Sequence, residues 1–134
     1  MTPRSRTRDV SKSYYRNYLK KAEECLRAAE HSHVDQDWNA VSINAIHACI
    51  AACDAMCVYH LGRRHAGERH NDAVALFKPI KSGEEINTNA SRITRVLRIK
   101  NIAEYEERLV YTSEAEKVFR DCKRFLEYVT KELS

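Results

Sequence analysis

The sequence is poor in glycine and proline, with three Gly and two Pro among 134 residues. So few turn residues favour helices over a turn-rich β fold. No uninterrupted apolar run reaches the roughly 20 residues of a membrane span. The N-terminus also lacks the apolar segment of a signal peptide. We therefore expect one cytoplasmic domain with no membrane partner.

A strong charge bias is also missing, since 23 Lys and Arg stand against 19 Asp and Glu. An excess of four positive charges is too small to establish a nucleic-acid partner. The five Cys are an odd number without a secretory signal, which indicates reduced thiols. Cys49, Cys53 and Cys57 could ligate zinc together with His60, but one straight helix rarely surrounds a tetrahedral ion. Core packing of these thiols is favoured, with no metal and no cofactor.

The segment from Asp37 to Leu61 contains no Gly or Pro and is apolar on nearly every side. A helix of this kind lies at the centre of a bundle. Asn44, His47 and Asp54 interrupt it on one stripe. They form either a network of mutually satisfied polar groups, which we favour, or the floor of a polar cleft.

Further apolar stripes with helical spacing flank the central segment. Helices are predicted over residues 9–29, 71–78, from about 89 through 104, and over 113–133, the last beginning with a capping box of Ser113 and Glu116. Residues 31–36 and 81–89 are predicted connectors, and residues 1–8 a basic, flexible arm. The fold class is all-α: an up-and-down bundle of four long helices plus one short helix, with residues 9–134 as a single domain.

Two features of the flanking helices concern binding. Tyr14, Tyr15 and Tyr18 could stack on bases, although a core stripe is favoured. In the fourth helix, Lys100 and Glu104 point inward one turn apart. A buried ammonium is costly when unpaired, so Lys100 is expected to pair with Glu104 or Asp54.

A surface arc of the fourth helix mixes apolar and basic side chains. Ile99 and Ile102 lie there beside Arg95 and Arg98, and the arginines are predicted to be solvated. Mixed apolar and arginine surfaces suit interfaces. This arc predicts a homodimer.

Three stretches, INAIHACIAACDA, KNIAEYE and SEAEKVFRDCKRFLE, together resemble the HEPN domain family. The resemblance covers roughly residues 11–133. It implies a small all-α domain that dimerises. Many such domains resemble toxins of toxin–antitoxin or defence systems, so it also implies an antitoxin or a nucleotidyltransferase as a candidate partner, and RNA or a nucleotide as a candidate ligand.

The family's ribonuclease signature is an Arg, often followed by a polar residue, and a His four to six residues further on. The resemblance puts Lys100 at the Arg position, Asn101 after it and Tyr105 at the His position. Cleavage through the RNA 2′-hydroxyl needs a base with a pKa near 7, such as His at about 6.5, whereas Tyr has a pKa of about 10. A literal match, Arg64 and His70, lies in a connector and is the alternative ribonuclease pair.

Three hypotheses follow. The domain is a non-catalytic HEPN-like module that binds a nucleotide, RNA or a protein partner, or it is a metal-independent ribonuclease toxin, or it is a structural helical adaptor without a ligand. A ribonuclease would use Arg64 with His70, or His47 as a base oriented by Asp54. The replaced signature favours a protein that is not an enzyme.

Overall fold

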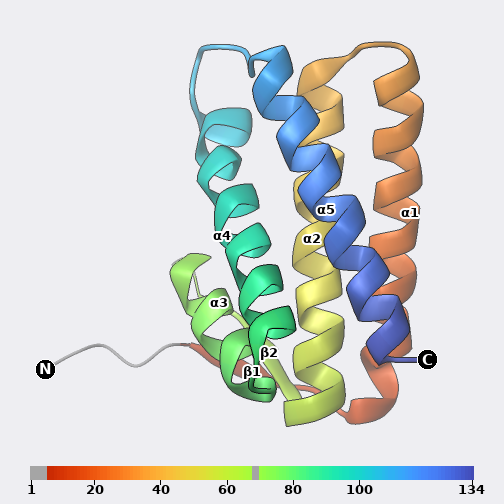
Figure 1. Ribbon diagram of the computed structural model, residues 1–134, viewed down its shortest axis with the longest axis vertical. Helices are drawn as coiled ribbons and strands as arrows, with labels where there is room; N and C mark the ends of the chain where they lie inside the picture. The colour runs from red at the N-terminus through yellow and green to blue at the C-terminus, as the bar shows by residue number, and fades with distance from the viewer. Residues whose placement is uncertain (1–5, 68–69) are drawn as a thin grey trace, which may run out of the picture.

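The computed structural model describes residues 6–67 and 70–134. Its four long helices are α1 (Tyr15–Val34), α2 (Trp38–Leu61), α4 (Glu84–Tyr105) and α5 (Thr112–Glu132), and the short helix α3 spans His70–Phe77. Figure 1 shows the long helices side by side, running alternately up and down, with α3 beside one end of α4. The predicted all-α bundle is confirmed.

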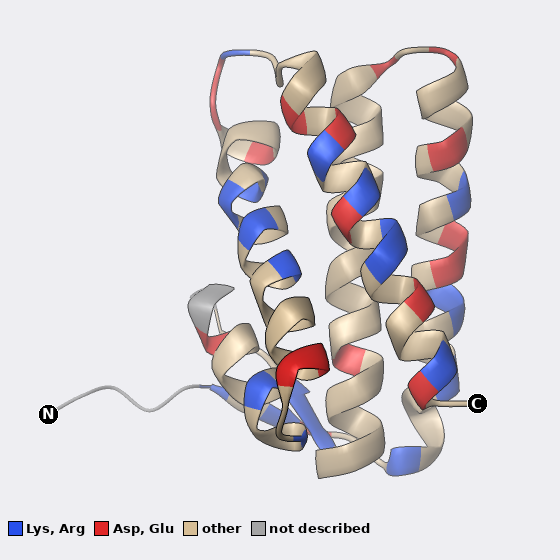
Figure 2. Ribbon diagram, viewed as in Figure 1, with Lys and Arg blue, Asp and Glu red and all other residues tan. Residues whose placement is uncertain are grey.

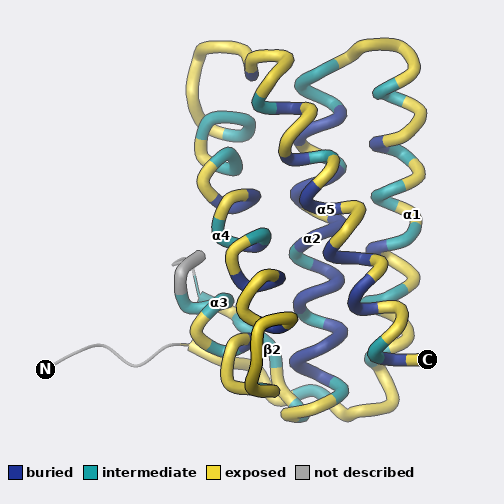
Figure 3. Tube along the Cα trace, in the orientation of Figure 1, coloured by how far each residue is buried: buried dark blue, intermediate teal, exposed yellow. Residues whose placement is uncertain are grey.

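Helix α2 lies at the centre, in contact with α1, α4 and α5. Many of its large apolar side chains, including Ile46, Met56 and Val58, are fully buried. Figure 3 shows α2 mostly buried, and Figure 2 shows it almost free of charged residues. Cys49, Cys53 and Cys57 are buried in this core, as the packing interpretation predicted.

The expectation that no segment could span a membrane is wrong for α2 on length and composition alone. Its best 18-residue window has a mean hydropathy of 1.6, but 67% of that window is buried inside the protein. A core helix enclosed by three others needs an apolar surface on nearly every side. The position of α2 in the bundle therefore accounts for its composition.

A small two-stranded sheet closes one end of the bundle, although no strand was predicted. Gly62 ends α2 with φ of 68°, a left-handed conformation that suits glycine. The chain then enters β2 (Arg63–His65), which pairs antiparallel with β1 (Thr7–Asp9). Val10 also donates its N–H to the carbonyl of Gly62 at 2.9 Å.

The predicted flexible arm is thus wrong for Thr7 and Arg8, while residues 1–5 lie outside the described part. The first helix was predicted from Asp9. Instead, a 3-10 turn over Lys12–Tyr14 precedes α1. The antiparallel partner explains the difference, because strand pairing depends on a segment more than fifty residues away.

Two predicted connectors are also shorter than expected. Helix α1 continues through His33, whose ring stacks on Phe119 at 4.8 Å and whose Nε2 lies 3.0 Å from Glu116. These contacts with α5 hold the last turn of α1. Helix α4 begins at Glu84 rather than near Asn89, with Glu84 and Glu85 in a first turn that favours acidic residues.

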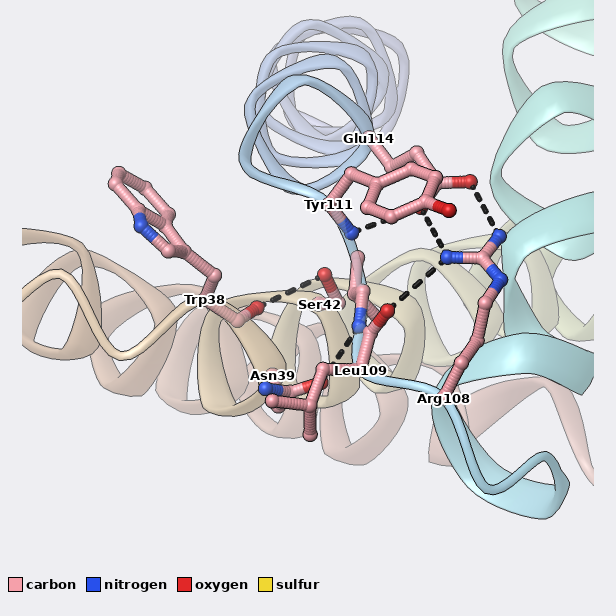
Figure 4. Close-up of polar contacts among 8 residues, drawn as sticks. Trp38, Asn39, Ser42, Arg108, Leu109, Tyr111 and Glu114 are labelled. Atoms are coloured by element: carbon pink, nitrogen blue, oxygen red, sulfur yellow. Dashed lines mark hydrogen bonds and ion pairs between the residues drawn. The ribbon is translucent and has the colours of Figure 1, made fainter.

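Hydrogen bonds join the connector between α4 and α5 to α2 and to the first turn of α5 (Figure 4). Asn39 of α2 accepts the N–H of Val110 at 2.9 Å. Glu114 accepts the N–H of Tyr111 at 2.9 Å and two bonds from Arg108. The start of α5 is therefore capped by Glu114, not by the predicted pair of Ser113 and Glu116.

Helices α4 and α5 are also joined by an ion pair that the sequence did not predict. Arg95 is solvated as expected, with its side chain 51% exposed, but its guanidinium also donates two hydrogen bonds to Asp121, at 2.9 and 3.0 Å. The Asp121 side chain is only 8% exposed. Two parallel bonds fix orientation as well as distance, so this pair sets how α4 lies along α5.

Candidate functional site

A cleft of about 890 Å³ opens along one side of α2. His47, Ile50, Ala51 and Asp54 form its floor, so the polar stripe of α2 is exposed to the cleft. The favoured interpretation, a network of mutually satisfied polar groups, is wrong. Asn44 does not line the cleft, because its amide donates to the carbonyl of Ala40 at 2.9 Å instead.

The walls of the cleft come from α1, α4 and the small sheet. Helix α1 contributes Tyr18 and Lys21, the 3-10 turn before it contributes Tyr14, and α4 contributes Lys100 and Glu104. Arg8 of β1 and Arg64 of β2 line the end that the sheet closes. Figure 2 shows Lys and Arg, in blue, on the two strands at this end of the bundle. Cations from three separate elements therefore meet at one cleft.

Lys100, Glu104 and His47 form a linked group on the α4 side. Lys100 Nζ lies 2.8 Å from one Glu104 oxygen, and His47 Nε2 lies 3.2 Å from the other. The predicted pairing of Lys100 is confirmed, with Glu104 as its partner. Burial alone would raise the pKa of Glu104, but hydrogen bonds and charges from Lys100 and His47 together lower it. Glu104 thus stays ionised and neutralises Lys100.

The prediction that Asp54 orients His47 is therefore wrong, because the carboxylate that contacts His47 is Glu104. The other two candidates of the α4 segment point elsewhere. Asn101 donates to Glu106 at 3.3 Å, and Tyr105 is 70% exposed, with the Lys100 ammonium 5.3 Å from its ring centre. Neither lines the cleft.

Asp54 is the carboxyl group on the floor of the cleft. Within the described part of the chain its side chain makes no hydrogen bond and no ion pair. Burial raises its pKa to about 7, although the charges of Arg64 and Lys21 act in the opposite direction. A titratable group in a cleft whose pKa is shifted by its surroundings is typical of functional sites.

The alternative pair of Arg64 and His70 is only partly described. Arg64 lies in β2, lines the cleft and donates from one terminal nitrogen to the carbonyl of His65 at 3.0 Å. His70 is the first residue of α3, but its side chain lies outside the described residues. The pair stays a prediction.

Sequence reasoning missed Arg8 and Lys21 as residues of the site. Arg8 was assigned to a flexible arm, and Lys21 to the solvated side of the first helix. The sequence feature that could have indicated this wall of the cleft was the cluster of Tyr14, Tyr15 and Tyr18. Tyr15 packs on Tyr59 with ring centres 5.0 Å apart, as a core residue would, whereas Tyr14 and Tyr18 line the cleft.

The family model described as HEPN domain matches residues 15–133, which is nearly the whole chain. A search of curated proteins finds no match.

Asp54→Asn is expected to stabilise the protein at alkaline pH. The Asp54 pKa of about 7 in the folded chain exceeds the roughly 3.9 of an unfolded chain, so the folded state binds the proton more tightly. The free energy of unfolding should therefore fall as pH rises from about 4 to about 7 and then level off. The amide should remove this loss, raising stability by up to about 4 kcal/mol at pH 8, because a difference of about three pKa units is worth about 1.4 kcal/mol per unit.

Urea unfolding across this pH range measures the effect. Asp35→Asn, at an exposed carboxyl beyond the end of α1, is the matched control. The account of Asp54 is contradicted if the wild type and Asp54→Asn lose stability equally between pH 4 and 7.

Lys100→Ala is expected to destabilise the fold. The Lys100 and Glu104 side chains are 12% and 18% exposed, which lies between a surface pair and a fully buried one. We expect a loss of about 2–3 kcal/mol in the free energy of unfolding, because Glu104 would lose its main cation. Thermal or urea unfolding measures it, with exposed Lys123→Ala as control; equal losses in both variants would refute the buried pair.

Proposed function

Because the chain belongs to the HEPN domain family, we propose that it is a non-catalytic member that binds a nucleotide or an RNA segment in the cleft. The observation that carries this proposal is the convergence of Arg8, Lys21 and Arg64 on one cleft. Among the described residues, none of the three has an ion-pair partner. Cations with no carboxylate partner are available to phosphate.

Aromatic side chains beside these cations support the same ligand class. Tyr18 of α1 and Tyr14 of the preceding 3-10 turn line one wall, and Tyr14 is 53% exposed. Bases stack on aromatic rings next to a positively charged groove. A nucleotide or an unpaired RNA segment offers both the phosphate and the ring.

The described residues of the cleft give little support to RNA cleavage. The charge of Lys100 is neutralised by Glu104, and Tyr105 faces solvent outside the cleft. His47 has a carboxylate partner, as an oriented base would. However, Asp54 lies seven residues further along the helix, about 10 Å along its axis. An acid and a base must both reach one phosphodiester group, and this separation disfavours that.

We also propose a homodimer. The sequence assigned its interface to Ile99 and Ile102, but both pack partly against the core around Val41 and Val110. The exposed apolar side chains lie further along, at Tyr105, Leu109 and Tyr111, which are 70%, 71% and 63% exposed. This patch and the family resemblance support self-association, in a setting such as a toxin–antitoxin or defence system with an antitoxin or nucleotidyltransferase partner.

The purified chain is expected to bind a labelled single-stranded RNA without cleaving it. Arg8→Ala and Lys21→Ala remove exposed cleft cations, and each should weaken binding by about tenfold, the value of a hydrogen bond to a charged group. Fluorescence anisotropy at fixed salt measures binding, and gel electrophoresis of the same samples measures cleavage. Lys123→Ala, at an exposed position of α5 outside the cleft, is the matched control.

Loss of affinity in Lys123→Ala equal to that in Lys21→Ala would indicate nonspecific charge attraction and contradict the cleft. Cleavage by the wild type that disappears in a folded His47→Ala variant would establish the ribonuclease instead. Failure of RNA and of nucleotides to bind would leave a protein partner or a structural role.

The chain is expected to scatter light as a dimer, with about twice the mass of the 15.5 kDa chain. Leu109→Asp should shift the mass toward the monomer, because it places a charge in the apolar patch. Ala75→Asp, at an exposed position of α3 at the other end of the bundle, is the control. A monomeric wild type at tens of micromolar would contradict the dimer.

A further inference from the structure

A second cavity shares part of its lining with the cleft. This inner pocket has a volume of about 230 Å³ and lies between α2, β2, α3 and α4. Ile50, Asp54 and Arg64 line both spaces, so they form the boundary between them. Pockets that hold whole drug-sized ligands have volumes of about 300–1,000 Å³. The inner pocket therefore has room for one ring system rather than a whole nucleotide.

The inner pocket has apolar walls on some sides and polar groups on others. Ile50, Cys53, Ile93 and Leu97 supply apolar surface from α2 and α4, and Ala73 supplies it from α3. The polar groups lie on α2 and β2 alone. A ligand that fits such walls has apolar faces and a polar edge.

The polar side of the pocket has unpaired groups within the described part of the chain. Arg64 Nε and both ring nitrogens of His65 are buried and have no hydrogen-bond partner. The carboxyl of Asp54 makes no hydrogen bond within the described residues either, but its oxygens are not among these buried unpaired atoms. Buried polar atoms are usually paired, since leaving one unpaired is costly. These atoms indicate that a polar partner is missing at this end of the pocket.

We propose that the inner pocket holds the base of a guanine nucleotide, or of a guanine in RNA, whose phosphate lies in the outer cleft. The inference rests on the function proposed above and names the ligand more closely. A guanine offers two adjacent N–H donors, which match the two oxygens of a carboxylate, and next to them a carbonyl acceptor, which matches a guanidinium. Asp54 and Arg64 supply these two groups at the boundary.

Adenine fits this pair less well. Its pairing edge offers one amino donor next to a ring nitrogen that accepts, so at pH 8, above the Asp54 pKa of about 7, one oxygen of the ionised carboxylate would face another acceptor. Unpaired or repelled polar groups in a desolvated pocket discriminate strongly between ligands. Ionised Asp54 is disfavoured in the empty protein because of burial, and two N–H donors from guanine would stabilise it.

Calorimetry with GMP, AMP and ribose 5-phosphate tests the proposal. GMP is expected to bind at least about tenfold more tightly than AMP or ribose 5-phosphate, the discrimination typical of one bidentate contact. Asp54→Asn should remove most of this preference, so that GMP and AMP bind this variant with nearly equal affinity. Equal affinities of the wild type for GMP and AMP, or a preference for AMP, would overturn the guanine assignment.

A second variant tests the position of the base independently of Asp54. Ala73→Phe fills the inner pocket from α3 without touching the cleft, whereas Ala75→Phe adds the same ring at an exposed position of the same helix. GMP affinity should fall to that of ribose 5-phosphate in the first variant only. An undiminished GMP preference in a folded Ala73→Phe would overturn the inner pocket.

The two proposals fail in different ways. If GMP, AMP and ribose 5-phosphate bind equally and Lys21→Ala weakens the binding of all three, the phosphate site in the outer cleft is supported. The base site in the inner pocket is then contradicted. If none of the three binds and RNA does not bind either, the proposed function falls and the inner pocket with it. Should Ala73→Phe fail to fold, the GMP-to-AMP ratio in Asp54→Asn decides the matter alone.

Discussion

The packing of α1, α4 and α5 around α2 leaves one strip of the central helix without a covering helix. On the covered sides α2 carries Ala, Ile, Val, Met and Cys side chains that are fully buried. On the open strip it carries His47 and Asp54. An apolar core helix cannot bury such groups without partners. The two polar side chains therefore require the bundle to open there, and the cleft depends on this constraint.

The two carboxyl groups of the cleft illustrate opposite electrostatic settings. Glu104 has a cation and an imidazole as partners, and its pKa is lowered although burial acts against this. Asp54 has no partner, and burial raises its pKa to about 7. One carboxylate stabilises the fold, while the other costs stability in the empty protein. Such a cost is understandable where a ligand supplies the missing partner.

Much of the bundle could be predicted from the sequence because it depends on local periodicity. The central position of α2 follows from its apolar surface, and the pair of Lys100 and Glu104 follows from their spacing within one helix. The strand pair β1–β2 could not be predicted, since Arg8 and Arg64 are opposed only after the chain has folded. For the same reason the sequence could not assign Glu104 to His47, or gather Arg8 and Lys21 at one site.

The start of α4 was predicted wrongly for a different reason. Glu84 and Glu85 follow Gly83 and suit a first helical turn, so the signal was local and was overlooked. That error matters less for the site, because the cleft residues of α4 lie at its other end. The cleft is determined by long-range contacts, and the sequence predicted its α2 floor and α4 wall but not its α1 wall or its closed end.

The central claim is that the cleft on α2 is where this protein binds its ligand. Amide chemical shifts of the labelled protein, recorded while a nucleoside monophosphate is added, test it most directly. The account predicts that the saturating shifts cluster at Arg8, Lys21, Asp54 and Arg64, with the far end of α1 unchanged. Shifts confined to the exposed surface around Leu109, or a protein with no saturating shifts, would contradict it.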